Sequence, residues 1–171
     1  MLQSYTAYPG HCNPEQFCSF ADMSFHPDPP SGYAFTLPIP TRWGDNDVYG
    51  HVNNVEYYAF FDTVINHWLI HEGGLDIEGG ETIGLCAESH CEYRAAVAFP
   101  DVIEAALRVG HLGRSSVRYE LALYRSGGES PVAVGWFVHV FVDRDRRRPV
   151  EIPPRMRSAL ERLITAEAQA S

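Results

Sequence analysis

The sequence predicts an α+β fold, in which an antiparallel β-sheet wraps around one long central helix, with a short helix near the C-terminus. One strand-like segment comes first, an apolar segment with helical periodicity follows, and four more strand-like segments with short turns come after it. Consecutive strands joined by short turns pair in antiparallel fashion, and their apolar face needs a helix to cover it. At 171 residues the chain is long enough for one domain with a substantial core and too short for two ordinary ones.

The N-terminal residues 1–32 mix Gly, Pro, Ser, His and Cys without a helical or strand period. This composition is typical of an irregular arm, so we expect the folded domain to span residues 33–171. Met23 stands shortly before the first regular segment, and the sequence leaves open whether translation starts there. The chain has neither the basic start of a signal peptide nor the ~20 apolar residues that span a bilayer. We therefore expect a cytoplasmic protein that does not associate with membranes.

The first strand is expected over residues 34–40, where two prolines indicate an edge or bulged strand because proline cannot donate to a ladder. Residues 55–72 predict the central helix, since apolar side chains recur at spacings of three and four. Gly73 and Gly74 supply its stop. Because aromatic and aliphatic residues widen the apolar face of this helix, it should be largely buried.

The remaining strands are expected over residues 82–98, 102–111, 116–124 and 132–143. In the third of these, apolar residues alternate with Arg118, Glu120 and Ala122, which gives one core face and one more polar face. Gly113 and Gly127 mark hairpin turns. A proline-rich segment then leads into a short terminal helix, predicted from residue 155 to about residue 165.

The loop over residues 41–54 carries most of the functional information, because it places Asp47 just ahead of the N-terminus of the central helix. A helix N-terminus offers unpaired backbone N–H groups and a partial positive charge, which can hold a developing oxyanion. A nearby carboxylate can attack a carbonyl carbon or activate water. The loop therefore predicts an active site for carbonyl chemistry. The alternative is structural: Gly50 forms the turn, Asn53 or Asn54 caps the helix, and Asp47 is a solvated carboxylate.

The run Asp-x-x-Gly-His-Val-Asn-Asn, from Asp47 to Asn54, leads directly into the aromatic start of the helix. It resembles the hotdog-fold thioesterases, in particular the 4-hydroxybenzoyl-CoA thioesterase and long-chain acyl-CoA thioesterase group. The resemblance extends over about residues 33–164, and its specificity is concentrated in residues 42–62. It implies the hotdog fold, in agreement with the order of elements above. It also implies an acyl-CoA thioesterase, which hydrolyses a thioester to a carboxylic acid and free CoA without a metal or redox cofactor.

The resemblance assigns Asp47 as the catalytic carboxylate, acting either as nucleophile or as general base for water. The oxyanion donor is then a backbone N–H near Asn54, and Gly50 allows the loop to approach the substrate closely. His51 orients Asp47 or protonates the departing thiolate, or else it only positions the loop. Tyr49 is a departure from plant acyl-ACP thioesterases, which are similar in fold and carry a catalytic Asn at this position. The catalytic network of those enzymes, which includes this Asn, is therefore not expected here.

A turn with the sequence Gly-Arg-Ser-Ser lies between the second and third of the four later strands. The resembling family places its contacts to the CoA nucleotide at this position. Arg114 is the candidate phosphate ligand, because its guanidinium can bind two phosphate oxygens at once, and Ser115 and Ser116 add further donors. An ordinary solvated turn remains the alternative.

Positive charge is confined to the second half of the chain. All thirteen basic residues are Arg, and twelve of them follow Tyr93, so the net charge is −12 up to Tyr93 and +3 beyond it. An acidic chain is a poor nucleic-acid binder, whereas a local Arg site for a phosphorylated ligand is compatible with it. Cysteines at positions 12, 18, 86 and 91 lack the Cys-x-x-Cys spacing of common zinc sites, so we expect no metal.

The resemblance also implies a homo-oligomer, either a dimer or a tetramer, in which sheets pair across a dimer and CoA sites lie between subunits. Two other functions stay open. One is a thioesterase that acts on acyl carrier protein, and the other is a non-catalytic hotdog module that binds an acyl thioester. The carboxylate of Asp47 argues against the second alternative, since binding alone needs no loop carboxylate.

Overall fold

The computed structural model describes residues 29–164. Most of the expected arm, including Met23, lies outside these residues, as does the expected end of the last helix at residue 165. The elements in chain order are the short 3-10 helix η2 (Pro30–Gly32), β1 (Phe35–Pro40), the 3-10 helix η3 (Trp43–Asp45), α1 (Asn54–His71), β2 (Thr82–Tyr93), β3 (Val102–Leu112), β4 (Ser116–Arg125), β5 (Pro131–Asp143) and α2 (Pro154–Glu161). Neither α-helix in the described part of the chain is long and apolar enough to cross a membrane.

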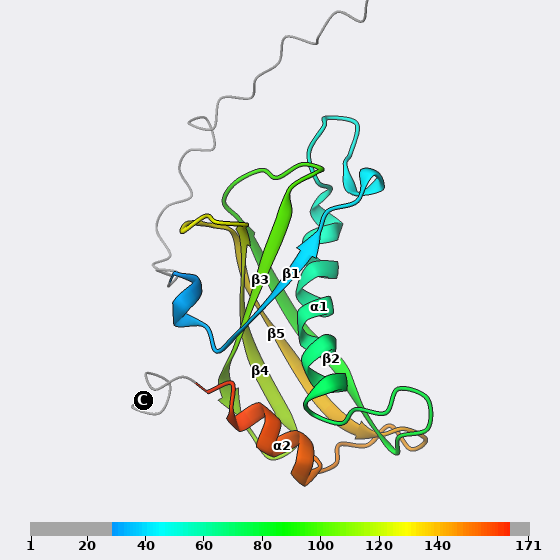
Figure 1. Ribbon diagram of the computed structural model, residues 1–171. Coiled ribbons are helices and arrows are strands. Elements are labelled where there is room, and N and C mark those ends of the chain that lie inside the picture. Colours follow the sequence, from blue (N-terminus) through cyan, green and yellow to red (C-terminus); the bar gives the residue numbers. More distant parts are fainter. Residues whose placement is uncertain (1–28, 165–171) are drawn as a thin grey trace, which may run out of the picture.

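The five strands form one sheet in the order β1-β3-β4-β5-β2, and every neighbouring pair is antiparallel. Figure 1 shows α1 lying across one face of this sheet and α2 packed at the end where β3 meets β4. The predicted α+β hotdog architecture is thereby confirmed. β1, with its two prolines, is an edge strand as expected, and β2 forms the opposite edge.

The core lies between α1 and the inner faces of β3 and β4. Phe61, Val64 and Ile65 of α1 are fully buried there, together with Leu107 of β3 and Leu121 of β4. Burying a side chain of this size stabilises the fold by about 1.5 to 3 kcal/mol. This packing holds α1 in a fixed position on the sheet, so that the loop before α1 is held at one end of the sheet.

The boundaries of α1 have local causes. The side chain of Asn53 accepts a hydrogen bond from the backbone N–H of Val55 at 3.2 Å, which caps the first turn. At the other end Gly74 has φ +70°, and the N–H groups of Glu72 and Gly73 both donate to the carbonyl of Trp68. A left-handed glycine is a common way to end a helix, so the glycine stop predicted from sequence is confirmed.

The structure shortens two predicted elements. β2 ends at Tyr93 instead of continuing to Ala98, because its partner β5 begins at Pro131. The next two backbone N–H groups, of Arg94 and Ala95, both donate to the carbonyl of Val132, so the ladder stops. Likewise, α2 ends at Glu161, several residues before the predicted end.

Candidate active site

The loop before α1 folds back on itself around Asp47. Asn46 and Val52 form an isolated antiparallel bridge, and the backbone N–H of Asp47 donates to the carbonyl of His51 at 2.8 Å. Inside this bridge, the N–H of Gly50 donates to the carbonyl of Asp47 at 3.1 Å, with φ +83° at Gly50. Only glycine adopts this left-handed conformation without steric cost, so Gly50 forms the turn, as the structural alternative expected.

The carboxylate of Asp47 is half-buried and held by main-chain donors. Its Oδ1 accepts hydrogen bonds from the backbone N–H of Tyr49 at 2.8 Å and of His51 at 3.4 Å. Its Oδ2 accepts none from residues 29–164. Contact between His51 and Asp47 is therefore made by the main chain of His51, and the imidazole makes no hydrogen bond to Asp47 within the described chain. The geometry fixes the direction of the carboxylate and leaves one oxygen available.

The first turn of α1 provides a backbone donor. Asn53 caps Val55 through its side chain, and its carbonyl accepts from the N–H of Glu56 at 3.0 Å. The N–H of Asn54 has no acceptor among residues 29–164, as expected for the first residue of a helix. The hydroxyl of Tyr93 donates to the carbonyl of Asn54 at 3.2 Å, which ties the start of α1 to the end of β2.

An ion pair between the buried carboxylate of Asp45 and the exposed guanidinium of Arg42 holds the start of the loop. The carboxylate of Asp45 is 1% exposed and accepts from the backbone N–H of Arg42 at 2.6 Å and from its Nε at 2.8 Å. Arg42 also reaches Glu56 on α1 at 3.1 Å. The hydrogen bond and the charge of Asp45 raise the pKa of Arg42. Sequence reasoning missed Arg42, although it is the one cation in the chain before Arg94.

The segment between β2 and β3 supports the other side of the loop. The backbone N–H of Val52 donates to the carbonyl of Val97 at 2.8 Å, and that of Phe99 donates to Oδ1 of Asn46 at 3.0 Å. The rings of Trp43 and Phe99 meet edge to face with their centroids 5.8 Å apart. The Asp47 loop is thus attached both to the helix and to the sheet.

The predicted CoA-binding turn, residues 113–116, is separate from the Asp47 loop. It connects β3 to β4, and the N–H of Gly113 donates to the carbonyl of Ser116 at 2.9 Å. The carbonyl of Arg114 accepts from the N–H of Ile152 at 3.0 Å, and the carbonyl of Ser115 accepts from the N–H of Phe141 at 2.8 Å. These bonds fix the main chain of the turn, while the side chain of Arg114 is exposed.

Asp47 and Arg114 lie at opposite ends of the sheet. Pro40, just before the Asp47 loop, pairs with Val102 at the start of β3, whereas Arg114 follows the end of that strand. Eleven residues of β3 span about 35 Å. In Figure 1 the loop lies above the start of α1, and the β3–β4 turn lies beside α2. A single chain therefore does not bring the two predicted parts of the site together.

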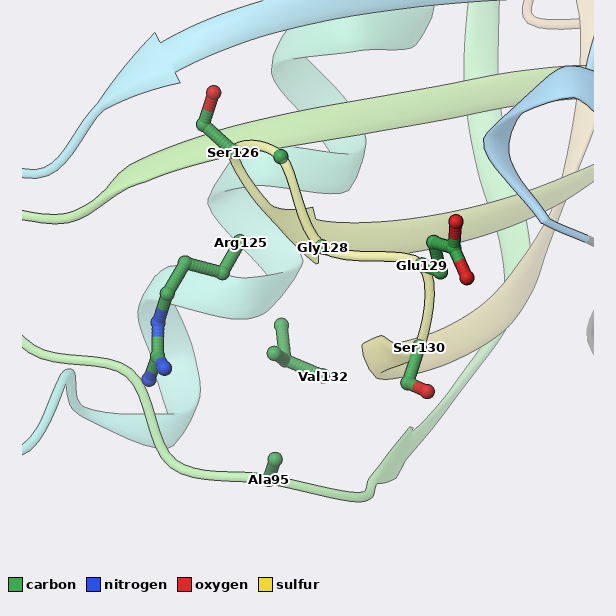
Figure 2. A pocket seen from close by; sticks show the side chains of 8 residues that line it. Ala95, Arg125, Ser126, Gly128, Glu129, Ser130 and Val132 are labelled. Atoms are coloured by element: carbon green, nitrogen blue, oxygen red, sulfur yellow. The ribbon is translucent and has the colours of Figure 1, made fainter.

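A cleft of about 460 Å³ opens at the Asp47 end of the sheet. Figure 2 shows the turn between β4 and β5 over the apolar side chains of Ala95 and Val132, with Arg125 beside them. The guanidinium of Arg125 already donates to Asp101 and to the carbonyl of Ala96, each at 3.0 Å. Ser126 and Ser130 line the cleft, but no histidine among its lining residues could activate their hydroxyls, so we do not assign the chemistry to it.

The cysteines do not form a metal or nucleophile site in the described part of the chain. Residues 29–164 contain no group of three His, Cys, Asp or Glu side chains that is able to hold a metal. His90 stacks on Trp136, on the face of β2 opposite to that of Cys91. Burial raises the pKa of Cys91 to about 11, which disfavours the reactive thiolate at neutral pH. Cys12 and Cys18 lie outside the described residues.

Comparison with known proteins also indicates a thioesterase-like protein. The sequence profile of the thioesterase-like superfamily matches residues 41–160. No curated protein matches this chain in sequence. Among solved structures, the PA5185 protein of Pseudomonas aeruginosa strain PAO1 is 57% identical, with a TM-score of 0.80 over 81% of this chain and 97% of that one.

Two further structures extend the comparison. The PA2801 protein of Pseudomonas aeruginosa is 30% identical, with a TM-score of 0.71 over 75% of this chain and 98% of that one. A thioesterase of Thermus thermophilus, solved in complex with coenzyme A and Zn, is 23% identical, with a TM-score of 0.66 over 77% of this chain and 95% of that one. At that identity the Thermus structure shows a shared fold alone.

Proposed function

Because the chain belongs to the thioesterase-like superfamily, a family of thioester hydrolases, we propose that it hydrolyses acyl-CoA to a carboxylic acid and free CoA at the Asp47 loop. One observation carries this proposal. A half-buried carboxylate with one oxygen available lies directly ahead of a helix whose first N–H, at Asn54, has no acceptor among residues 29–164. These are the two groups that thioester hydrolysis requires.

The chemistry needs little more than these groups. A thioester carbonyl is electrophilic and its thiolate is a good leaving group. In one route Asp47 attacks the carbonyl carbon and the C–S bond breaks, which leaves a mixed anhydride that water then opens. In the other route Asp47 takes a proton from a water molecule that attacks the same carbon. In both routes the N–H of Asn54 stabilises the negative oxygen, helped by the positive end of the α1 dipole.

We further propose that the enzyme works as a homodimer, or as a tetramer built from such dimers. β2 is a twelve-residue edge strand whose middle residues are exposed, and an open edge of this length pairs readily with a second strand. Arg114 is too far from Asp47 to act with it in one chain. An Arg114 supplied by another subunit, together with Ser115 and Ser116, would provide the phosphate contacts to CoA. CoA is proposed as the carrier by analogy with the Thermus thioesterase, which shares the fold and was solved with coenzyme A.

The experiment is to measure thiol release from acyl-CoAs with short, aromatic and long acyl groups, alongside the matched acyl-ACPs. We expect hydrolysis of at least one acyl-CoA series, with a lower Michaelis constant for acyl-CoA than for the acyl-pantetheine that lacks the nucleotide. Faster turnover of acyl-ACP at equal concentration would favour the carrier-protein alternative. Binding without thiol release from any substrate would overturn the hydrolase in favour of a binding module.

A further inference from the structure

One tyrosine of the sheet holds the first turn of α1. The hydroxyl of Tyr93, the last residue of β2, donates to the carbonyl of Asn54 at 3.2 Å. Asn54 is also the residue whose N–H has no acceptor among residues 29–164. Within the described residues, no other hydrogen bond joins the main chain of this turn to the sheet. Tyr93 is therefore the polar link between the sheet and the proposed oxyanion donor.

The strand end that carries Tyr93 is fixed on β5. Tyr93 pairs with Ala133, which is the last pair of the ladder between β2 and β5. Immediately after it, the backbone N–H groups of Arg94 and Ala95 both donate to the carbonyl of Val132, at 2.8 and 3.1 Å. These bonds hold the main chain at the end of β2 in place. A side chain that reaches α1 from this point therefore positions the helix relative to the sheet.

A second tyrosine holds the ring of Tyr93. Tyr57 of α1 meets it edge to face with the ring centroids 5.1 Å apart, and the Tyr57 hydroxyl donates to the carbonyl of Ala95 at 3.4 Å. The two hydroxyls thus link the helix and the strand end in opposite directions. Tyr57 is 4% exposed, whereas Tyr93 is 40% exposed. Tyr57 is part of the core, and Tyr93 lies at its border with solvent, beside the start of α1.

The hydroxyl of Tyr93 is a permanent donor at neutral pH. Burial, with a smaller contribution from the neighbouring Cys91, raises the pKa of Tyr93 to about 12. The phenol therefore stays protonated, and its bond to the carbonyl of Asn54 does not titrate near pH 7. A group that exchanges protons with a substrate needs a pKa close to the working pH. Tyr93 accordingly suits a role in positioning and not a role in acid–base catalysis.

The other bonds near this turn do not hold Asn54 itself. The cap at Asn53 binds the N–H of Val55, and Arg42 binds the side chain of Glu56. Oxyanion stabilisation depends on a donor about 3 Å from the oxygen, and a misplacement of about 1 Å can cost about 100-fold in rate. A bond that restrains Asn54 directly therefore bears on the rate of the chemical step.

We propose that Tyr93 is a positioning residue for thioester hydrolysis, because its bond to the carbonyl of Asn54 keeps the N–H of the same residue where the substrate oxygen becomes negative. This inference rests on the proposed function, since it takes the N–H of Asn54 as the oxyanion donor. Tyr93 acts through Asn54 and does not touch the reacting atoms. Its loss should therefore slow the chemical step and leave the binding of CoA unchanged.

The kinetic test uses Tyr93→Phe, which removes the hydroxyl and keeps the ring against Tyr57. We expect kcat to fall by about tenfold, less than the roughly 100-fold or more that follows removal of an oxyanion donor, because the N–H itself remains. The Michaelis constant should stay the same. The rate–pH curve should keep its shape, because positioning moves no proton. An unchanged kcat, or the loss of one limb of the rate–pH curve, would overturn the proposal.

Tyr57→Phe is the matched control, since it removes a neighbouring tyrosine hydroxyl that bonds Ala95 and not Asn54. Because Tyr57 is buried, this variant should lower the melting temperature at least as much as Tyr93→Phe does, yet keep kcat. Thermal unfolding and steady-state kinetics of the two variants check this contrast. Equal losses of kcat would show that the tyrosine pair only supports packing, which would overturn the positioning role.

A binding measurement separates this inference from the proposed function. One probe is a hexanoyl-CoA analogue with CH2 in place of the thioester sulfur, which keeps the carbonyl and is not hydrolysed. The other is the same analogue with the carbonyl reduced to CH2. In titration calorimetry the wild type should bind the ketone about fivefold more tightly, the value of one hydrogen bond. Tyr93→Phe should lose most of this difference and bind the carbonyl-free probe as the wild type does.

The outcomes distinguish the two proposals. If no thioester is hydrolysed but Tyr93→Phe loses the preference for the ketone, the proposed function fails while the role of Tyr93 in placing Asn54 stands. If thioesters are hydrolysed and the preference survives in Tyr93→Phe, the positioning role fails while the hydrolase stands. Equal weakening of both probes in Tyr93→Phe would show that Tyr93 shapes the CoA site in general, which would also overturn the positioning role.

Discussion

Asp45 and Asp47 lie two residues apart on one loop, yet the fold gives their carboxylates different partners. The carboxylate of Asp45 is buried and bound by the main chain and guanidinium of Arg42, whereas that of Asp47 accepts hydrogen bonds from two backbone N–H groups within residues 29–164. A carboxylate whose oxygens are both occupied holds the loop in place. A carboxylate with an available oxygen can act on a substrate. The two residues therefore form a matched pair for separating structure from chemistry.

We predict that Asp47→Asn lowers kcat/KM by at least ~100-fold, the order expected for loss of a nucleophile or general base. The amide keeps the size of the side chain and its hydrogen-bond acceptor, so the melting temperature should change little. Steady-state kinetics and thermal unfolding of the same preparation check both parts. Near-normal turnover by the folded variant would remove Asp47 from the mechanism.

The neighbouring Asp45→Asn serves as the control. It should lower stability and largely keep activity, whereas Asp47→Asn should lower activity and keep stability. Replacing this buried carboxylate weakens its bonds to Arg42, which we expect to lower the free energy of unfolding by about 1 to 3 kcal/mol. Activity at a temperature where the variant is folded should fall far less than in Asp47→Asn. A larger loss of turnover in Asp45→Asn would mean that the two roles are exchanged.

A further prediction concerns Arg114. If it binds a CoA phosphate, Arg114→Ala should raise the Michaelis constant for acyl-CoA by roughly tenfold, because an exposed charge-assisted contact is weakened by solvent. The reaction of the matching acyl-pantetheine, which has no nucleotide, should keep its Michaelis constant. Added salt should mimic the substitution for the wild-type enzyme. An equal effect on both substrates would show that Arg114 shapes the turn instead.

Much of this architecture could be predicted from periodicity and turn residues. The spacing of apolar residues located α1 to within one residue at each end, and the glycines at residues 73 and 74 marked its stop. The end of β2 could not be predicted, because residues 95–98, after Arg94, are as apolar as those of a buried strand. Its length is decided by where β5 begins, which is a property of the partner strand.

In the candidate site, too, features set by neighbouring residues could be predicted, whereas features set by the whole fold could not. The turn at Gly50 and the cap at Asn53 could be predicted because they depend on neighbouring residues in the chain, whereas the catalytic role of Asp47 stays a prediction. The distance between Asp47 and Arg114 depends on the whole length of β3 and has no local signature. The burial of His139 also had a sequence signal, because it occupies the inward-facing position between the apolar residues Phe137 and Phe141.

Assembly can be tested at the bulge in β2. Ala87 is the extra residue between Cys86 and Glu88, which pair with consecutive residues of β5, so it has no partner in the register. Proline is tolerated at bulges but blocks pairing of an edge strand. We predict that Ala87→Pro stays folded and shifts the protein from dimer to monomer in analytical ultracentrifugation, whereas Ala87→Ser does not.

The monomer should also lose the CoA contacts supplied by another subunit. Ala87→Pro should therefore raise the Michaelis constant for acyl-CoA, and adding Arg114→Ala to it should cause little further increase. Fully additive effects would show that Arg114 acts independently of the β2 interface. A wild-type protein that is monomeric and fully active at nanomolar concentration would contradict the proposed assembly.

The last prediction concerns how stability depends on pH. Burial lowers the pKa of His139 in the folded protein, and the unfolded chain binds a proton at the ordinary pKa of about 6.5. As the pH falls below about 6.5 the unfolded state takes up a proton that the folded state does not, so the free energy of unfolding decreases. Denaturant unfolding of the wild type between pH 8 and 5 should show this loss. In His139→Leu, which cannot bind a proton, the loss should be smaller. An equal loss in wild type and His139→Leu would show that other groups cause it.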